Sequence, residues 1–391
     1  MPKKKLTPEA IVREMVVNNV RSRRDLCRSF GICKASASRM VTKLLEDGIL
    51  EEGDKFSASR RGRRTVSLHL VPETAYLVGA ELGRGRNALH ACMIDCSDHS
   101  VVAEVAHSTD TSIEYHELLC QFCGSIREAL STSDVDPRKI VGLGIAMPGL
   151  PTGTVPLEEI HIHMKTAADD WSVVDLAQTF CELDLPVVGA NTPYCMAEYE
   201  RRYGLGRRQS SFINISIQHE GLGAVVYEGG RVLGEGTRAG ELGHMRIDSE
   251  GPVCPMCKKK GCLATYVAGK YLPPEDRRHG PEWDTRLAEC MHRLATGTAN
   301  LVKMLPVDRV VVDGIYVDYA EQARPILTEA VADELGGFDG PVPEIRFGEK
   351  MDLKASLGAA IQAGDVFLED YLRRNVFDQS QDTPRSMQPV G

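Results

Sequence analysis

One histidine and three cysteines lie within nineteen residues of this chain, and these side chains commonly bind transition metals in proteins. They are His244, Cys254, Cys257 and Cys262. The same stretch holds two glycines and two prolines, which favour a tight loop. One imidazole and three thiolates on such a loop fit tetrahedral zinc, and because protein fills all four positions, we expect a structural ion. The alternative is chance clustering in a chain of 12 cysteines.

The composition indicates a protein of the reducing cytoplasm. Most other cysteines are scattered singly along apolar or helical stretches, and the chain is not cysteine-dense for its length, so we expect free thiols. No run of 18 apolar residues occurs, and Lys3, Lys4 and Lys5 are not followed by the apolar region of a signal peptide. We therefore expect a cytoplasmic protein without a membrane segment.

The charge of the chain is unevenly distributed. At 391 residues the chain is long enough for two or three domains. Residues 1–70 hold 16 of the 46 basic and 8 of the 55 acidic residues, which leaves 30 basic and 47 acidic residues for the rest. A small basic head on an acidic body is expected when only the head meets a polyanion such as DNA. On charge alone, a solvated basic face without a partner is the alternative.

Local signals in the first 50 residues predict a helix-turn-helix. A cap at Thr7 followed by proline starts a first helix that runs to about Asn19. Ser22 can cap a second short helix, and Gly31 provides the turn that follows it. A third helix starts near Cys33 and ends at an aspartate-glycine stop signal. Two short helices around a glycine turn are typical of this DNA-binding motif.

In that arrangement the start of the third helix faces the major groove of DNA. Hydroxyls and cations at these positions suit base edges and phosphates. The candidate contacts are Lys34, Ser36, Ser38 and Arg39. We therefore expect sequence-specific binding to double-stranded DNA.

Two strand-like segments follow the third helix and predict the wing of a winged helix-turn-helix. They cover 49–50 and 66–70 and flank a polar tip with Gly53 and Asp54. Four arginines lie between the segments, and arginines beside a recognition helix commonly enter a narrow minor groove. A merely solvated loop is the alternative. These residues are Arg60, Arg61, Arg63 and Arg64.

From residue 76 onward, strand patterns alternate with helical patterns, which predicts an α/β fold. The pattern occurs twice, so we expect two α/β lobes with a cleft between them. The predicted strands are 76–83, 89–94, 140–146, 211–217, 223–227 and 309–312, and the predicted long helices are 113–131 and 283–305.

The head and four glycine-rich segments of the body resemble the ROK family (repressor, open reading frame, kinase). The segments are Val78–Gly83, Gly142–Gly149, Gly240–His244 and Gly261–Leu263. The resemblance continues to Leu357–Ala360 and so covers nearly the whole chain. It implies a ribonuclease-H-like, actin-like two-lobed fold with a zinc loop. It also implies sugar kinase or sugar-responsive repressor activity, commonly in dimers or tetramers.

Kinases of the family need a glycine-rich phosphate cradle and a base that accepts the proton of the sugar hydroxyl. This chain departs from that pattern at every such element. Glu81 begins a first phosphate loop in which Arg84 replaces a glycine, and Thr192 stands where the family has its aspartate base. Glu220 lies in the second phosphate loop, and Asp313 lies in a glycine pair of the nucleotide lobe. We therefore expect no kinase activity.

The sugar contacts of the family are partly retained. Two carboxylates are missing, because Thr192 and Ala264 stand where the family has an aspartate and a glutamate. The cleft could hold a modified, anionic or amino-substituted sugar, an unrelated metabolite, or nothing. The retained positions, which we take as the expected effector-binding residues, are Gly149, Asn191, Glu241 and His244.

Together these observations predict a transcriptional repressor gated by a sugar-like or other small-molecule effector. We expect a winged helix-turn-helix over 1–72, a two-lobed effector-binding and oligomerisation domain over 73–370, and a disordered tail over 371–391. The partners would be an operator on double-stranded DNA and a second copy or more, in a homodimer or homotetramer. The alternatives are a ROK sugar kinase with a DNA-binding head and a DNA-binding oligomer without an effector.

Overall fold

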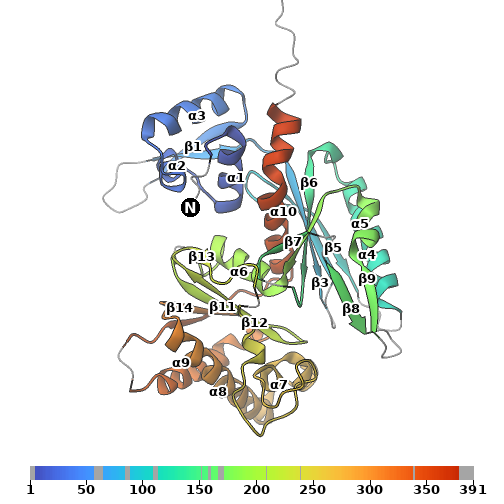
Figure 1. Ribbon diagram of the computed structural model, residues 1–391, viewed down its shortest axis with the longest axis vertical. Helices are drawn as coiled ribbons and strands as arrows, with labels where there is room; N and C mark the ends of the chain where they lie inside the picture. Colours follow the sequence, from blue (N-terminus) through green and yellow to red (C-terminus); the bar gives the residue numbers. More distant parts are fainter. Residues whose placement is uncertain are drawn as a thin grey trace, which may run out of the picture.

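The computed structural model of the protein consists of a small head on a two-lobed body (Figure 1). The head contains three helices and a two-stranded ribbon, and each lobe is built around one β-sheet. Among the residues described, no helix combines the length and the apolar character needed to cross a lipid bilayer. The structure describes residues 5–56, 65–83, 89–108, 113–150, 152–156, 160–165, 171–207, 209–237, 239–337 and 340–377.

The three helices of the head lie where the sequence predicts them. The Thr7 hydroxyl caps the first helix by accepting from Ala10 N at 3.2 Å, and Ser22 caps the second by accepting from Asp25 N at 3.2 Å. Gly31 ends the second helix with φ of 63°, a left-handed conformation that favours glycine. The elements of the head are α1 (Pro8–Asn18), α2 (Arg23–Phe30), α3 (Lys34–Glu46), β1 (Leu50–Phe56) and β2 (Thr65–Leu70).

The ribbon differs from the predicted wing in the position of its tip. Gly53 and Asp54, expected at the tip, belong to β1, which pairs antiparallel with β2. A bulge between Glu52 and Lys55 accommodates them, and a Cβ at residue 53 would lie only 2.6 Å from Ser67 Oγ. The strand continues past the glycine because its missing side chain leaves room for those of β2. Arg60, Arg61, Arg63 and Arg64 lie outside the described residues.

The first lobe is a six-stranded sheet with helices on both faces. Its elements are β3 (Tyr76–Leu82), β4 (Leu89–Asp95), β5 (Val101–His107), α4 (Tyr115–Thr132), β6 (Ile140–Met147), β7 (Thr154–Pro156), α5 (Leu176–Phe180), β10 (Val187–Asn191) and α10 (Lys354–Leu372). The strand order is β5-β4-β3-β6-β10-β7, in which β3, β6 and β10 are parallel neighbours. α4 and α5 cover one face, and α10 covers the other. A separate hairpin consists of β8 (His161–Lys165) and β9 (Trp171–Asp175).

Two glycines let α10 lie close to this sheet. A Cβ at Gly79 of β3 would lie 1.9 Å from Ser356 O, and one at Gly144 of β6 would lie 1.9 Å from Ala359 O. Any side chain at either position would therefore push the helix away from the strands. The close approach makes α10 the central helix of the lobe.

The second lobe is a five-stranded sheet with two long helices on its outer face. Its elements are β11 (Phe212–Ile217), β12 (Leu222–Glu228), β13 (Arg231–Val232), α7 (Ala264–Val267), α8 (Gly280–Met304), β14 (Arg309–Gly314), α9 (Ala320–Glu334) and β15 (Glu344–Phe347). The strand order is β13-β12-β11-β14-β15. Ile213 and Ile215 of β11 share a core with Trp283 of α8 and Leu327 of α9, which fixes these helices on the sheet.

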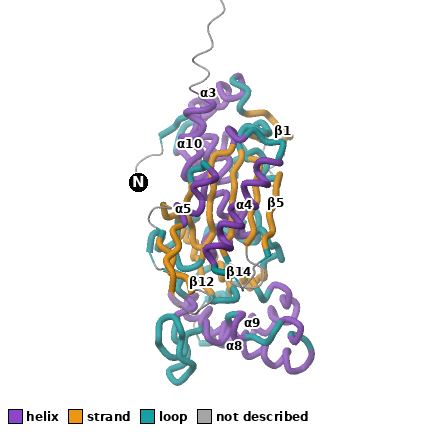
Figure 2. The backbone as a smooth tube through the Cα atoms, turned by 90° about the vertical axis from the view of Figure 1, so that its right-hand side faces the viewer, coloured by secondary structure: helices purple, strands orange, loops and turns teal. Residues whose placement is uncertain are grey.

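Two helices join the lobes. α6 (Thr192–Arg202) leads from β10 of the first lobe to β11 of the second, and α10 returns from β15 to the first lobe. The two helices pack against each other, and a shared core that includes Ala146, Tyr194 and Val225 continues from one sheet to the other. Figure 2 shows the lobes stacked along the long axis, with α8 and α9 at the end opposite α3.

The head and the first lobe share a hydrophobic core. Ile11 and Met15 of α1 lie in the same cluster as Leu368 of α10. Arg13 Nε donates to Asp365 O at 3.0 Å, and the Arg13 guanidinium also pairs with the Asp365 carboxylate. The head is therefore packed on α10, as Figure 1 shows, and is not merely tethered to the body.

The prediction that a disordered tail begins at residue 371 is wrong. α10 continues to Leu372, and a π-helical turn follows over Arg373–Phe377. Tyr371 and Val376 pack against the core that the head and the first lobe share, so burial of apolar side chains extends the helix. Residues 378–391 of the expected tail lie outside the described part of the chain.

Candidate functional site

The four predicted metal ligands come together on one compact loop. His244 ends a short 3-10 helix over Leu242–His244, and the three cysteines lie in the segment that follows. Two short antiparallel bridges fold this segment back on itself. Gly261 has φ of 69°, and a Cβ there would lie 1.6 Å from Asp248 O, so only glycine fits beside the last cysteine.

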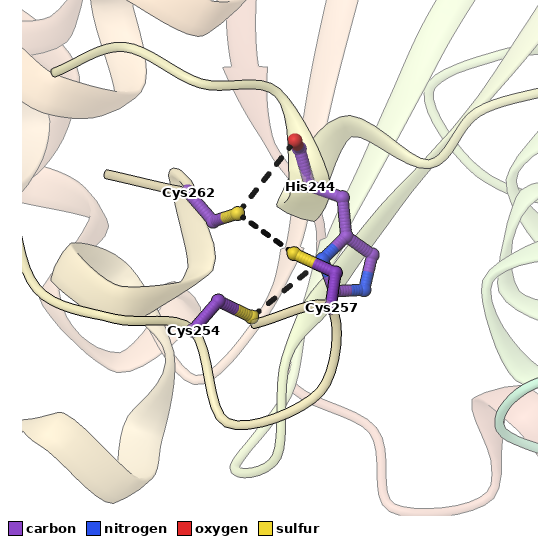
Figure 3. Close-up of side chains that lie close together, drawn as sticks. All are labelled: His244, Cys254, Cys257 and Cys262. Carbon is purple, nitrogen blue, oxygen red and sulfur yellow. Dashed lines mark hydrogen bonds between the residues drawn. The ribbon is translucent and has the colours of Figure 1, made fainter. Parts of the chain in front are cut away.

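The ligand atoms have the spacing that a tetrahedral ion requires. His244 Nδ1 lies 3.7 Å from Cys254 Sγ, and Cys257 Sγ lies 3.3 Å from Cys262 Sγ (Figure 3). All four ligand atoms lie within 4.8 Å of one another. Zinc–sulfur bonds of about 2.3 Å in a tetrahedron place neighbouring sulfurs about 3.8 Å apart. The residues present therefore fit zinc in geometry and in donor chemistry.

Hydrogen bonds already favour the thiolate form of one ligand. The backbone N–H of Lys259 and the thiol of Cys262 lower the pKa of Cys257 to about 7. Burial, together with the same hydrogen bond, raises the pKa of Cys262 to about 12. Thiolate is the form of cysteine that ligates metals.

Two of the expected effector-binding residues lie together at the carboxyl ends of parallel strands. Asn191 ends β10 and is paired with Met147 of β6, two residues before Gly149. Asn191 Nδ2 donates to Leu150 O, and Gly149 has φ of 86°, so the chain turns sharply there. In open α/β sheets, this edge is where ligands commonly bind.

Glu241 and His244 belong to the second lobe, because Leu242 between them lies in the core of that lobe. His244 N donates to Glu241 O at 3.0 Å, so both lie on one turn. The preceding segment is joined to the first lobe through Thr152, whose hydroxyl donates to Ala239 O at 2.9 Å. The Glu241 side chain is exposed, and the second ring nitrogen of His244 points away from the three sulfurs (Figure 3). The expected effector residues therefore come from both sides of the junction between the lobes.

Thr192 and Ala264 stand at the two positions where the family has a carboxylate and this chain has none. Thr192 is 4% exposed, and its hydroxyl has no hydrogen-bond partner among the described residues. A buried hydroxyl without a partner is uncommon in folded proteins. Ala264 begins α7, and its Cβ lies 3.4 Å from where a Cβ on Gly243 would be, beside the metal loop.

Glu220, expected in the second phosphate loop, and Asp313, expected in a glycine pair of the nucleotide lobe, both form ion pairs within the chain. Glu220 accepts from Lys270 Nζ at 3.0 Å, and His219 Nδ1 lies 3.3 Å from the same carboxylate. Asp313 is fully buried and pairs with Lys354 Nζ at 2.6 Å. Each carboxylate is therefore already bound by a lysine of the same chain.

The first phosphate loop begins with a carboxyl group in an unfavourable environment. Burial and, to a smaller extent, repulsion by Asp352 raise the pKa of Glu81 to about 7. Arg84, the other departure in this loop, lies outside the described residues.

The candidate DNA contacts lie on the outer side of α3. Lys34, Ser38 and Arg39 are exposed, and Ser36 is half-buried with its hydroxyl 3.4 Å from Cys33 Sγ. The opposite side of α3 faces the core of the head and carries Ala37, Val41 and Leu44. Burial of this stripe turns the polar side of the helix outward.

Thr42 and Lys43 extend this polar surface and were not among the predicted contacts. Both are exposed, and Thr42 follows Ser38 by four residues, which places the two on one face of the helix. Helical spacing from Ser38 is the signal that could have found Thr42.

An α/β body of two stacked lobes that are joined by two helices, with a cysteine loop on the second lobe, is the architecture of actin-like sugar kinases and related repressors. The sequence signature of the ROK family matches residues 79–365, which is more than half of the chain. The chain belongs to the ROK family.

Similar proteins include repressors. The xylose repressor of Bacillus subtilis (strain 168) is 26% identical over 271 residues, which cover 69% of this chain and 67% of the relative. The DNA-binding transcriptional dual regulator NagC of Escherichia coli (strain K12) is 25% identical over 274 residues, which cover 68% of this chain and 63% of the relative. The matched region thus spans about two thirds of the length of these relatives.

Solved structures share the fold. A ROK family transcriptional regulator, a homologue of the E. coli MLC protein, superimposes with a TM-score of 0.68 at 20% identity and covers 94% of this chain and 98% of its own. A ROK family glucokinase from Streptomyces griseus, in complex with glucose and AMPPNP, has a TM-score of 0.58 at 20% identity and covers 73% of this chain and 98% of its own.

Proposed function

We propose that this chain is a transcriptional repressor that binds operator DNA through a winged helix-turn-helix and responds to a sugar-like effector without phosphorylating it. One observation carries the proposal: a head with an exposed basic helix is packed on a kinase-like body whose phosphate positions hold carboxylates of the chain. Both halves of that observation are needed, because the body alone is common to kinases and repressors.

The exposed side of α3 supports DNA binding. Lys34 and Arg39 can reach phosphates or guanine edges, and the Ser38 hydroxyl can donate to or accept from a base. The similar transcriptional regulator covers 94% of this chain, whereas the glucokinase covers 73%. Two copies of the head, in a homodimer or homotetramer, would contact paired half-sites.

The residues at the expected kinase positions support the absence of phosphoryl transfer. Thr192 is a hydroxyl where a kinase needs a carboxylate to accept the proton of the sugar hydroxyl. The Glu220 carboxylate is already paired with Lys270, so a phosphate entering there would have to compete with it. Both features argue against phosphoryl transfer.

The retained polar groups support a small effector that carries hydroxyls. Of the retained residues, Asn191 comes from the first lobe, and Glu241 and His244 come from the second. A ligand that contacts both sides would favour one relative position of the lobes. The zinc bound by His244 and the three cysteines would keep the imidazole in place and supplies no chemistry to a reaction.

The function is tested by selecting bound duplexes from a random DNA pool with the purified full chain. We expect enrichment of a sequence with two related half-sites; recovery of unenriched DNA would overturn the proposal. In parallel, a coupled assay with ATP, magnesium and a panel of hexoses and amino sugars should show no turnover. Turnover lost in the Glu81→Gln variant would instead establish a kinase.

A further inference from the structure

A buried ion cluster lies where the chain crosses between the lobes. Lys354 Nζ donates to Glu200 Oε1 and to Asp313 Oδ1, each at 2.6 Å, and the exposure of all three side chains is at most 3%. Asn214 Nδ2 donates to the second oxygen of Asp313 at 2.6 Å, and Leu205 N donates to the second oxygen of Glu200 at 2.6 Å. Charged side chains are rarely buried so completely unless they are paired.

The three charged residues come from three elements that meet at this crossing. Lys354 is the first residue of α10, Glu200 lies in the last turn of α6, and Asp313 belongs to β14. Because α6 enters the second lobe and α10 leaves it, the cluster ties both connections to the sheet of that lobe. Gly348 makes room for it, since a Cβ there would lie 2.0 Å from Asp313 Oδ1. A change in the angle between the lobes must therefore alter at least one of these contacts.

The same two helices also hold the first helix of the head. Arg13 of α1 donates from Nε to Asp365 O of α10 at 3.0 Å and pairs with the Asp365 carboxylate. Arg201 of α6, the residue after Glu200, donates to Asn18 Oδ1 at the end of α1 at 3.2 Å. The 19 residues of α10 span about 28 Å, so one rigid helix reaches from the ion cluster to the head.

We propose that the Asp313–Lys354–Glu200 cluster is a latch that fixes the angle between the lobes, and that α10 and α6 transmit this angle to α1. The inference rests on the proposed function, because it supplies a route from the cleft to the DNA-binding helix. Coupling between two sites is reciprocal. Disturbing the contact between Arg13 and Asp365 must therefore also loosen the latch, although Arg13 lies in the head.

Hydrogen–deuterium exchange on the full chain, without DNA or effector, tests this coupling from both ends. Asp313→Asn keeps the shape of the side chain and leaves Lys354 and Glu200 as a neutral pair. Arg13→Gln removes the cation that holds α1 on α10. The matched control is Arg23→Gln, which removes another arginine of the head whose ion pair with Glu52 stays within the head.

Each of the two variants should speed amide exchange both in α1 and near the ion cluster. We expect a rise of at least about fivefold in α1 and in residues 348–357 for each variant, within the usual range of coupling between sites. The control should leave residues 348–357 unchanged. Faster exchange confined to residues 348–357 in the Asp313→Asn variant, or to α1 in the Arg13→Gln variant, would overturn the proposal.

If Asp313→Asn does not fold, the Arg13→Gln variant and its control decide the question alone, since Arg13 lies outside the ion cluster. The experiment contains no DNA, so its outcome is separate from that of the duplex selection. A chain that shows this coupling but enriches no DNA sequence would lose the proposed function and keep the latch.

Discussion

His244 and the three cysteines of the metal loop place an imidazole and three sulfurs within 4.8 Å of one another. Cys254 and Cys262 are buried, so water screens their charges poorly if they ionise. A divalent cation removes this repulsion, and its binding free energy is then part of the folding free energy of the loop. The spacing of the four residues in the sequence was enough to predict the cluster, because all four lie on one short loop.

We expect the purified chain to contain about one zinc ion and the Cys254→Ser variant to lose most of it. The variant should also melt at a lower temperature, because the loop loses a ligand. Elemental analysis and thermal unfolding measure the two effects. Cys181→Ser is the control, since Cys181 is an exposed thiol away from the loop. A wild-type chain that contains no metal, and whose melting temperature does not change when a chelator is added, would contradict the proposed zinc site.

The buried carboxylate of Glu198 makes the stability of the protein depend on pH in the acid range. It is 3% exposed and pairs with Arg202 at 2.5 Å and Arg201 at 3.0 Å. Burial would raise its pKa, but the two arginines outweigh burial and hold the pKa at about 2. Because the folded pKa lies below the unfolded value of about 4.3, the stabilisation is present above that value and is lost as the pH falls toward 2.

The Glu198→Gln variant should therefore lose about 3 kcal/mol of unfolding free energy at pH 7, since Arg202 is left buried without its partner. Its deficit relative to the wild type should shrink at pH 3, where the wild-type pair already contributes less. Denaturant unfolding at the two pH values measures this. An equal deficit at both pH values would show that the carboxylate charge is not the cause.

At the scale of elements, local signals predicted the head better than the edges of the sheets. The caps at Thr7 and Ser22 and the turn at Gly31 act within a few residues, so sequence alone located all three helices. The strand β5 was not predicted, since it lies on a sheet edge and is largely exposed, which removes the usual apolar signal. The helix α9 was not predicted either, and Pro325 lies inside it.

The features that were not predicted from the sequence depend on contacts between residues that are distant in the chain. Asp313 was recognised only as a departure from a glycine pair, because its partner Lys354 lies 41 residues away in the chain. The wing tip was misplaced for a similar reason, since Gly53 fits into β1 only through its contact with Ser67. The clustering of the four residues on the cysteine loop needed no such knowledge, because they lie close together in the sequence.

The arginine-rich segment 60–64 is predicted to contact the minor groove of DNA. We expect the Arg63→Ala/Arg64→Ala variant to bind most weakly, relative to the wild type, at duplexes with A·T-rich flanks. Arginines prefer the narrow and electronegative minor groove of such DNA. Competition binding with flanks that differ only in base composition measures the effect. An equal loss of affinity on all flanks would mean that the arm contacts phosphates alone.

At the scale of the whole molecule, the chain combines a basic head with an acidic body through one shared core. The core that includes α1 and α10 makes the head an extension of the first lobe, so a movement of the lobes has a physical route to α3. Glu220 is paired with Lys270, and Asp313 is paired with Lys354, at two positions where the sequence departs from the expected kinase pattern. These features favour sensing over catalysis, and they make DNA binding by α3 the central claim.

The affinity of the full chain for the duplex enriched by selection tests that claim most directly. Fluorescence anisotropy at fixed salt would compare the affinities of the wild type and of the Lys34→Ala/Arg39→Ala variant. The wild type and the variant should melt at the same temperature, because the two substituted side chains are exposed. We predict that the variant binds at least about 30-fold more weakly, because each lost charged contact costs about 1 kcal/mol or more. Equal affinity of the two proteins would contradict the account.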